Sequence, residues 1–391
     1  MVAEAQLVCQ PAVALQYLCA PAIEIQPPDF LDESRPPTGD VPLSIDPQRR
    51  ESALSCSTSI HTTAISKATR KFTPKIRSGS HTDLGPRSSN EDQHVRIDDL
   101  SSHLGSLYSW HEPGSFYAVF DGHGGPNAAV FMKNNATQFF FENAELPGAS
   151  DIDEKFLQDM EKSHLKSFLL ADQAMADEQG GVDPYCGTTA LTALILGRNL
   201  LIANAGDCRA VLCRNGDAVQ LSQDHRPSSQ MERKRVENLG GTIEYGYLNG
   251  ELAVTRSLGD WYMKLPLGSV SPLTAEPEFR WTLLSEDDEF LIIGCDGIWD
   301  VISNQEAVSL VRRVLRHHND PQVCAKELVE QALRQDTCDN VTAVVVCFSS
   351  SPPEIRDSSV GDHPTGQRPR MRFCMSEEAR NKLRSLLEGG K

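Results

Sequence analysis

The chain has 391 residues, enough for one large domain or two of ordinary size. It carries 37 Lys and Arg against 54 Asp and Glu, and this net charge of −17 argues against nonspecific binding to nucleic acid or to anionic membranes. No uninterrupted apolar run is long enough to cross a bilayer. With the net charge, this means that we expect neither nucleic acid nor a membrane as a partner.

The N-terminal part, Met1–Lys75, is rich in Pro, Ser and Thr and shows no sustained period of 2 or 3.6. This composition predicts a disordered or loosely ordered extension, which serves either as a linker or as a regulatory or docking tail. The first twenty residues lack a basic stretch, carry Glu4 and are interrupted by Pro11, so we do not expect a signal peptide.

The central part, Ile76–Ser350, alternates apolar strand-like runs with amphipathic segments. The predicted strands are, in chain order, His94–Ile97, Phe116–Phe120, Thr188–Leu196, Leu200–Asn204, Arg209–Arg214, Phe290–Gly294 and Val341–Phe348. Gly197–Asn199 predicts a hairpin after the third strand, and Asn215-Gly216 is a strong turn signal after the fifth.

Four helices are predicted between these strands. They begin at Pro126, at Asp153 (ending near Ala176), at Ser303 and at Asp320. Ser303 with Glu306 forms a capping box, and Asp320-Pro321 is a typical helix start. The residues expected to face the core are Ala128, Phe131, Met132, Phe139, Leu165, Phe168, Leu169, Val308, Val311, Leu315, Ala325, Leu328, Val329 and Ala332. Antiparallel strands with grouped helices predict an α+β fold of stacked sheets covered by helices.

The C-terminal part, Ser351–Lys391, is polar and is predicted to be a tail. Arg368–Arg372 holds three arginines, which either form part of a solvated tail or assist nuclear entry. Ser376–Leu387 has the pattern of a small helix.

The 11 cysteines are scattered and include no C-x-x-C pair. In a chain of this length they are typical of reduced core residues in an intracellular protein, so we expect the cytoplasm, the nucleus or both as its location. Nothing in the sequence indicates an obligate oligomer, and a monomer is expected.

Aspartates recur at the ends of apolar strands: Asp121, Asp207, Asp296 and Asp339. A carboxylate beside the core is costly unless it is paired or coordinated, and four such positions are hard to explain as ordinary turns. Asp121 and Asp296 are each followed by Gly, whose backbone can approach an ion closely. Carboxylate and carbonyl oxygens suit Mg²⁺ or Mn²⁺.

Two further acids, Glu91 and Asp92, precede the first predicted strand, and Arg87 lies just before them. Such an arginine either balances the nearby charge or binds a phosphate. His123 stands between Asp121 and a predicted helix start. A histidine in this position is a plausible proton donor to a leaving oxygen.

The ordered set of motifs resembles the metal-dependent protein phosphatase family, type 2C, in its plant-like form, over Ile76–Ser350. The matching strings are Arg87-Ser-Ser-Asn-Glu-Asp92, Asp121-Gly-His-Gly-Gly125, Gly187-Thr-Thr-Ala190, Gly206-Asp-Cys-Arg209, Thr255-Arg-Ser-Leu-Gly-Asp260, Asp296-Gly-Ile-Trp-Asp300 and Asp339-Asn340. Each string alone is moderately specific, whereas their common order is highly specific.

The resemblance implies a central β-sandwich of two antiparallel sheets flanked by helices, a four-layer αββα arrangement. It implies hydrolysis of phosphoserine and phosphothreonine in proteins by a water or hydroxide that bridges two Mg²⁺ or Mn²⁺ ions. The implied ligands are Asp92 and Asp121 shared at the centre, the Gly122 carbonyl, Asp296 and Asp339 on the second ion, and Glu91 through a water.

The same resemblance assigns roles to residues around the ions. Arg87 would bind the substrate phosphate, and His123 would be the general acid. Asp207, Asp296 and Asp300 match the acids around a weaker third ion in some members.

The expected flap, Gly240–Leu252, departs from one group of plant relatives. Members inhibited by abscisic-acid receptors carry a Trp shortly before the string that begins at Thr255, and here that place falls at Tyr245. Control by those receptors is therefore not expected, although the flap is expected to influence substrate choice.

Two other interpretations are open to test. Cys208–Arg214 has the C-x5-R spacing of thiolate phosphatases, but the run between them is strand-like and lacks Gly. Alternatively, the chain could be a phosphatase-like binding protein with little or no catalysis. The presence of all the matched acids and of His123 favours an active enzyme.

Overall fold

The computed structural model describes residues 72–148, 152–177, 181–264 and 270–349. The predicted tail Ser351–Lys391, with its Arg368–Arg372 cluster and its Ser376–Leu387 helix, lies outside the described residues, as does the predicted extension except for residues 72–75. The limits proposed for these three parts of the chain stay predictions.

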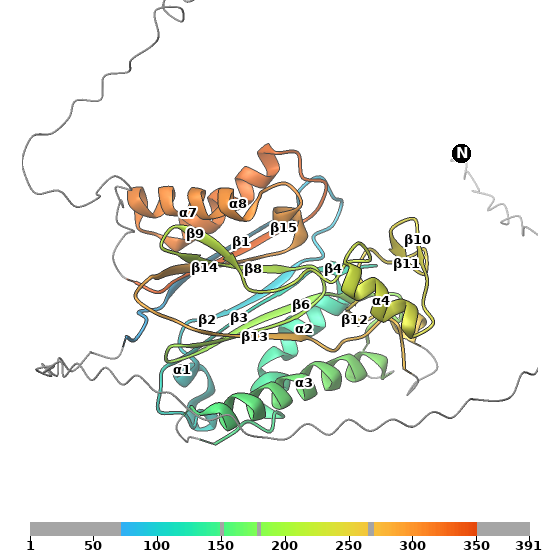
Figure 1. Cartoon of the computed structure of the whole chain (residues 1–391), viewed down its shortest axis with the longest axis horizontal. Helices are drawn as coiled ribbons and strands as arrows, with labels where there is room; N and C mark the ends of the chain where they lie inside the picture. The colour runs from blue at the N-terminus through green and yellow to red at the C-terminus, as the bar shows by residue number, and fades with distance from the viewer. Residues whose placement is uncertain (1–71, 149–151, 178–180, 265–269, 350–391) are drawn as a thin grey trace, which may run out of the picture. The chain divides into compact units, whose positions relative to one another are not determined.

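Two five-stranded antiparallel sheets form the centre of the fold (Figure 1). In spatial order, the first holds β1 (Arg77–Asp83), β15 (Val341–Cys347), β14 (Asp288–Gly294), β8 (Arg209–Arg214) and β9 (Asp217–Gln220). The second holds β13 (Glu278–Leu283), β7 (Asn199–Ala205), β6 (Ala190–Leu196), β3 (Gly114–Phe120) and β2 (Gln93–Ile97).

The central strands are apolar on both faces because each face meets another layer. In β15, Val344 and Val346 belong to the core between the sheets, whereas Val341 and Val345 face the helices above. This alternation follows from the two-residue period of a strand.

Helices cover the outer face of each sheet (Figure 1). α7 (Asn304–His318) and α8 (Pro321–Arg334) pack on the first sheet, and α2 (Asn127–Thr137) and α3 (Glu154–Ala176) pack on the second. The predicted α+β sandwich with four layers is thereby confirmed.

Local signals place several of these elements. The Ser303–Glu306 capping box is present at the start of α7, and the Asp320 side chain accepts a hydrogen bond from the Gln322 amide at the start of α8. Asn215 has a φ of 55° and Gly216 a φ of 92° at the β8–β9 turn, in agreement with the predicted hairpin.

The inward face of α3 differs from the prediction at Leu169, and Leu165 is only partly buried. Phe168 is fully buried, but Leu169 is 40% exposed. Adjacent residues lie about 100° apart around a helix, and Leu169 falls on the side of Phe168 that points away from the buried face. The buried face continues instead through Ser167, Ala171 and Asp172, which include polar side chains that the apolar pattern did not reveal.

Smaller elements gather at one end of the sandwich (Figure 1). They are β4 (Gly122–His123), β5 (Gly187–Thr188) and β12 (Leu258–Gly259) in one small sheet, the β10 (Ile243–Glu244) and β11 (Tyr247–Leu248) hairpin, α4 (Gln230–Asn238), α5 (Trp261–Lys264) and α6 (Asp296–Trp299). α1 (Leu100–Leu104) and the short helical turns Gly105–Leu107 and Gln138–Glu142 flank the second sheet.

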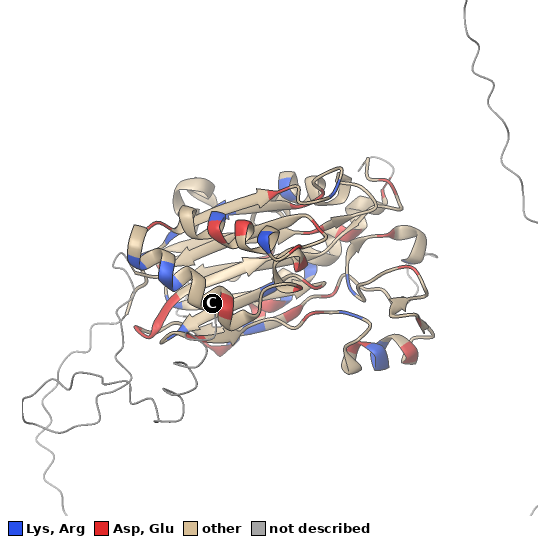
Figure 2. Ribbon diagram, turned by 90° about the horizontal axis from the view of Figure 1, so that it is seen from above, with Lys and Arg blue, Asp and Glu red and all other residues tan. Residues whose placement is uncertain are grey.

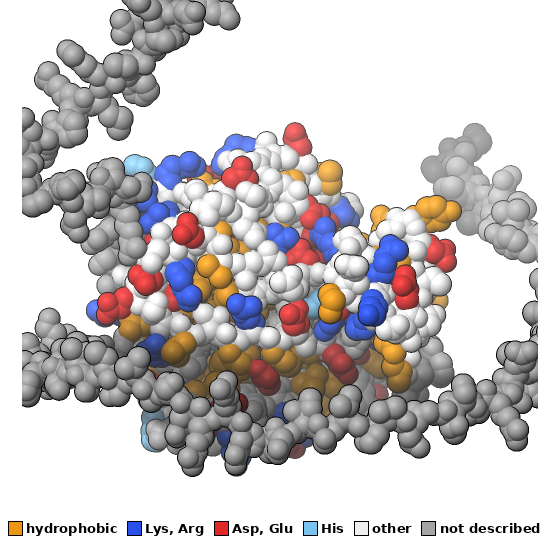
Figure 3. All heavy atoms as spheres, viewed as in Figure 1, with side chains coloured by type: hydrophobic (Ala, Val, Ile, Leu, Met, Phe, Trp, Pro, Cys, Tyr) orange, Lys and Arg blue, Asp and Glu red, His pale blue; other side chains and the backbone are white. Residues whose placement is uncertain are grey.

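Charges of both signs are interspersed on the surface. Figure 2 shows acidic and basic residues on the same short helix α4, and Figure 3 shows the same mixture over the coloured part of one face. No helix among the described residues combines the length and apolar character that a membrane span requires.

The burial difference on α3 gives a matched test of the fold. Phe168→Ala should lower the free energy of unfolding by about 3–5 kcal/mol, because the ring is fully buried and packs edge-on against Phe140. Leu169→Ala should cost about 1 kcal/mol or less. Urea unfolding of both variants measures the two values, and equal losses would contradict the placement of this helix.

Candidate active site

Strand pairing in the second sheet brings two acids together. β2 and β3 are antiparallel, and Gln93 lies opposite Phe120. Asp92 immediately precedes β2, and Asp121 immediately follows β3, so both leave the sheet at the same end. Their carboxylate oxygens lie within 4.8 Å of one another.

The first sheet supplies further acids at the same end. β14 and β15 are antiparallel, with Gly294 opposite Ala343. Asp296, which follows β14, and Asp339, which precedes β15, therefore lie at the same end of the two strands. Asp207 follows the end of β7 in the other sheet. Carboxylate oxygens of Asp121, Asp207 and Asp296 lie within 4.8 Å of one another. The acids thus come from rigid strand ends in both sheets.

These residues surround a cavity of about 290 Å³. Its lining includes most of the predicted site and part of the flap: Arg87, Glu91, Asp121, Gly122, His123, Gly124, Thr189, Asp207, Tyr247, Glu251, Leu252, Ala253, Val254, Asp296, Asp339 and Asn340. Asp92 lies buried against Asp121 behind this lining, and Asp300 contacts the cluster from its outer side through Arg226. The structure therefore brings together every residue predicted for the site.

Burial and mutual repulsion make the cluster electrostatically costly. Burial raises the pKa of Asp92 to about 6. Burial, followed by the charges of Asp92 and Asp296, raises the pKa of Asp121 well above its usual range. The pKa of Asp296 rises to about 8, mainly through burial and then through Asp207. These shifts indicate that positive charge from the described residues does not fully offset burial and mutual repulsion in the cluster.

Asp92 carries the clearest sign of a missing ligand. Its Oδ2 accepts a 2.6 Å hydrogen bond from Thr342, but its buried Oδ1 has no hydrogen-bond partner among the described residues. A Cβ at Gly122 would lie 2.5 Å from the Glu91 carbonyl oxygen, so only glycine fits beside the acids. An unsatisfied carboxylate oxygen within a set of oxygen donors fits a hard divalent cation.

Cys295 lies beside Asp92 and Asp121 but is not a good ligand for such an ion. Burial raises the pKa of its thiol well above the usual range, and the neighbouring aspartates raise it further. Its sulfur accepts a hydrogen bond from the Thr342 amide at 3.1 Å. The protonated thiol fills space at the base of the site.

Arg87 lies at the mouth of the cavity and is more than half exposed. Its Nη2 donates to Oδ2 of Asp339 at 2.8 Å, and its Nε donates to the Cys338 carbonyl at 2.9 Å. Of the two roles considered from the sequence, charge balance is the one seen directly. The phosphate-binding role stays a prediction.

His123 is held by an acid from a distant motif. Its Nε2 lies 2.8 Å from Oδ2 of Asp260, which also accepts a hydrogen bond from Ser257. Burial alone would lower the pKa of His123, but the hydrogen bond and charge of Asp260 raise it above the ordinary value. The protonated ring is therefore favoured, with Asp260 fixing its orientation.

The outer acids meet a cation that the sequence analysis did not assign to the site. Arg226 contacts Asp207, Asp296 and Asp300, each at 2.8 Å. Burial would lower the pKa of Arg226, but the carboxylates raise it, so the guanidinium remains charged. Arg226 lies in a loop with no motif of its own in the sequence analysis. Asp260 was marked in the sequence only as the last residue of the motif Thr255-Arg-Ser-Leu-Gly-Asp260.

The thiolate-phosphatase interpretation is wrong. Cys208 is fully buried and precedes β8, and its neighbour Thr189 contacts the sulfur at 3.2 Å. Burial, and next the charge of Asp121, raise the pKa of this thiol well above its usual range. A protonated thiol without access to solvent cannot act as the nucleophile.

Comparisons with known proteins agree with this geometry. The family model described as protein phosphatase 2C matches residues 76–341. "Probable protein phosphatase 2C 47" of Oryza sativa subsp. japonica is 57% identical over 83% of this chain and 83% of its own length. "Probable protein phosphatase 2C 13" of Arabidopsis thaliana is 54% identical over 88% of this chain and 87% of its own length.

Solved structures show the same fold. The serine-threonine phosphatase 2C from Toxoplasma gondii superposes with a TM-score of 0.58 at 23% identity, covering 71% of this chain and 98% of that one. A sex-determining protein of C. elegans gives a TM-score of 0.59 at 24% identity, covering 71% and 65%. With the family match and the plant relatives, these observations establish that the chain belongs to the protein phosphatase 2C family of metal-dependent serine/threonine protein phosphatases.

Proposed function

We propose that this site removes phosphate from phosphoserine and phosphothreonine with the help of two Mg²⁺ or Mn²⁺ ions held by the acidic cluster. The observation that carries the proposal is the buried Oδ1 of Asp92, which has no hydrogen-bond partner among the described residues and lies against Asp121. Buried acids in this state need a cation or a proton.

The acids around Asp121 would form two neighbouring ion positions. Asp92 and Asp121 would be shared at the centre, with the Gly122 carbonyl beside them, and Asp296 and Asp339 would complete the second position. Glu91 would act through a water. Bound ions would supply an activated water and would neutralise charge on the phosphoryl oxygens.

The proton required by the leaving oxygen would come from His123. Its Nε2 is engaged with Asp260, so Nδ1 is the nitrogen that can hold the transferable proton. Asp260 would keep the ring oriented and favour its charged form, which suits a general acid.

The phosphate itself would be bound by Arg87. Its guanidinium lies at the cavity mouth and is already directed by the Cys338 carbonyl and by Asp339. Arginine presents a planar set of donors that matches a phosphate dianion, and its exposure allows a substrate to reach it.

The wider context forms part of the proposal. We place the protein in the cytoplasm, the nucleus or both, as a monomer that acts on phosphoproteins. The seven cysteines among the described residues are all free, which suits a reducing compartment. Tyr245 is 99% exposed at the tip of the β10–β11 hairpin. A phenol there in place of an indole supports independence from abscisic-acid receptors.

Phosphate release from a phosphothreonine peptide tests the proposal. The purified chain should release phosphate with Mn²⁺ or Mg²⁺, and excess EDTA should stop the release. Release that persists in EDTA would rule out the two-ion site. A folded chain that binds Mn²⁺ without turnover on any phosphopeptide would instead support a binding protein.

Asp121→Asn separates the catalytic role from a structural one. Turnover should fall to background, because the shared ligand is lost. In EDTA, however, the variant should be more stable by roughly 1–2 kcal/mol, since a buried acid surrounded by like charges becomes neutral. Thermal melts and phosphate release measure the two effects. Asp217→Asn, at an exposed position on β9, should change neither.

His123→Asn tests the general acid through the leaving group. Release from a phosphothreonine peptide should slow about a hundredfold or more, because the alkoxide leaving group needs a proton. Release from p-nitrophenyl phosphate should slow far less, since nitrophenolate leaves without one. An equal loss on both substrates would show that His123 has another role.

A further inference from the structure

Arg226 occupies the outer part of the acidic cluster. Its Nε lies 2.8 Å from Oδ2 of Asp207, its Nη2 lies 2.8 Å from Oδ2 of Asp296, and its Nη1 lies 2.8 Å from Oδ1 of Asp300. Each contact uses a different nitrogen. One planar cation is thus matched to three carboxylates, two from α6 and its end and one from the end of β7.

These carboxylates are the same acids that the sequence resemblance places around a weaker third ion. A divalent ion and a guanidinium cannot both take the same oxygens, because each needs direct contact with them. We propose that Arg226 is a built-in counter-ion of the outer acids, and that a divalent ion binds Asp207, Asp296 and Asp300 only when the guanidinium moves away. This inference rests on the proposed function, since it concerns the same acidic site.

The loop that carries Arg226 is fastened on its N-terminal side. Asp224 accepts hydrogen bonds from Nε and Nη2 of Arg209 at 3.0 and 2.5 Å. His225 is joined to Gly206 twice: its amide donates to the Gly206 carbonyl at 2.9 Å, and its Nδ1 accepts from the Gly206 amide at 3.1 Å. The backbone at Arg226 is therefore tied to the residue that precedes Asp207.

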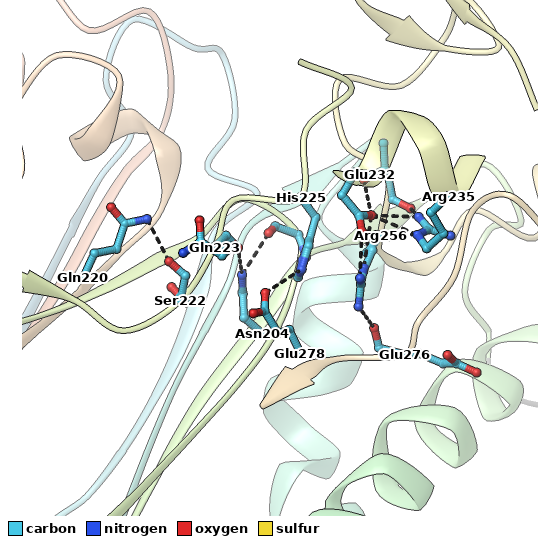
Figure 4. A network of polar contacts seen from close by, with 12 residues as sticks. Asn204, Gln220, Ser222, Gln223, His225, Glu232, Arg235, Arg256, Glu276 and Glu278 are labelled. Carbon is cyan, nitrogen blue, oxygen red and sulfur yellow. Dashed lines mark hydrogen bonds and ion pairs between the residues drawn. The ribbon is translucent and has the colours of Figure 1, made fainter. Parts of the chain in front are cut away.

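A buried amide strengthens this attachment (Figure 4). Asn204 on β7 donates from Nδ2 to the Gln223 carbonyl at 2.8 Å and to the Gly206 carbonyl at 2.9 Å. Figure 4 also shows His225 directed at Glu278, with Nε2 and Oε2 separated by 3.4 Å. With its backbone held in this way, the arginine is directed at the acids by the fold and not by chance surface pairing.

The ion pairs of Arg226 are nevertheless open to solvent on their outer side. Arg226 retains 28% of its side-chain exposure, and Asp300 retains 51%. Solvent and ions therefore reach the outer edge of the cluster, in contrast to Asp207, which is 4% exposed. Rotation of the arginine would open three carboxylates to an incoming ion without moving the loop.

Counting charge explains why the outer position would respond to ion concentration. Arg226 offsets one of the three negative charges that it contacts, and because it is part of the chain this does not depend on the concentration of ions in solution. A divalent ion would offset two, but it must first displace three charge-assisted hydrogen bonds. Arg226 should therefore contact the outer acids at low concentrations of divalent ions, and a divalent ion should replace it at high concentrations.

Competition between Arg226 and a divalent ion is tested by measuring Mn²⁺ binding to the full chain with isothermal titration calorimetry and electron paramagnetic resonance. In Arg226→Gln, the dissociation constant for the outer Mn²⁺, the ion bound in addition to the two inner ones, should be about tenfold or more lower than in the unaltered chain. Adding Asp300→Asn to Arg226→Gln should remove that gain. The matched control is Arg214→Gln, because Arg214 is paired with the buried Asp288 at the opposite end of β8 and β14.

The outcomes are distinct. Equal number and affinity of Mn²⁺ ions in the unaltered chain and in Arg226→Gln would overturn the inference, as would a gain that survives Asp300→Asn or appears in Arg214→Gln. Absence of any bound Mn²⁺ in every protein would instead overturn the proposed function. If Arg226→Gln does not fold, Arg226→Lys replaces it: one ammonium spans fewer oxygens, so the additional ion should still bind more tightly than in the unaltered chain. Unchanged binding in that variant would overturn the inference.

Discussion

Electrostatic repulsion among buried carboxylates is the constraint on which the rest of this structure depends. Asp121 lies within 4.8 Å of acids from both sheets, and Asp92 beside it is almost wholly removed from water. Such a cluster is costly in a low-dielectric interior unless cations or protons compensate it. The sandwich can hold it because the acids stand at the ends of paired strands, whose positions are fixed by the buried core and by the backbone hydrogen bonds.

The residues around the cluster are best understood as the means by which its charge is balanced. Arg87 pairs with Asp339 at the cavity mouth, and Arg226 spans three acids on the outer side. The innermost pair, Asp92 and Asp121, meets no arginine among the described contacts, and its raised pKa values record that deficit. In the proposed function, divalent ions at this inner position would complete the balance and would supply the metal-dependent chemistry of the family.

Much of this could be predicted from the sequence because the signals are local. Strand ends followed by Asp, the Asn215-Gly216 turn and the Ser303–Glu306 cap each depend on a few neighbouring residues, and all appear in the structure. Leu169 was misplaced because the apolar pattern does not distinguish adjacent residues on a helix whose buried face contains polar groups. Arg226 and the Asp260–His123 pair were missed because their partners come from distant segments. Their roles follow from three-dimensional packing, which no spacing rule along the chain records.

The most direct test of the account is a crystal structure of the chain grown with Mn²⁺, with data collected at a wavelength where manganese scatters anomalously. The account predicts two strong anomalous peaks in the cavity, both beside Asp92 and Asp121 and one of them also beside Asp296 and Asp339, at distances of about 2.0–2.3 Å from carboxylate oxygens. A well-ordered cavity without anomalous density, or manganese bound at exposed acids elsewhere and not at Asp121, would contradict it.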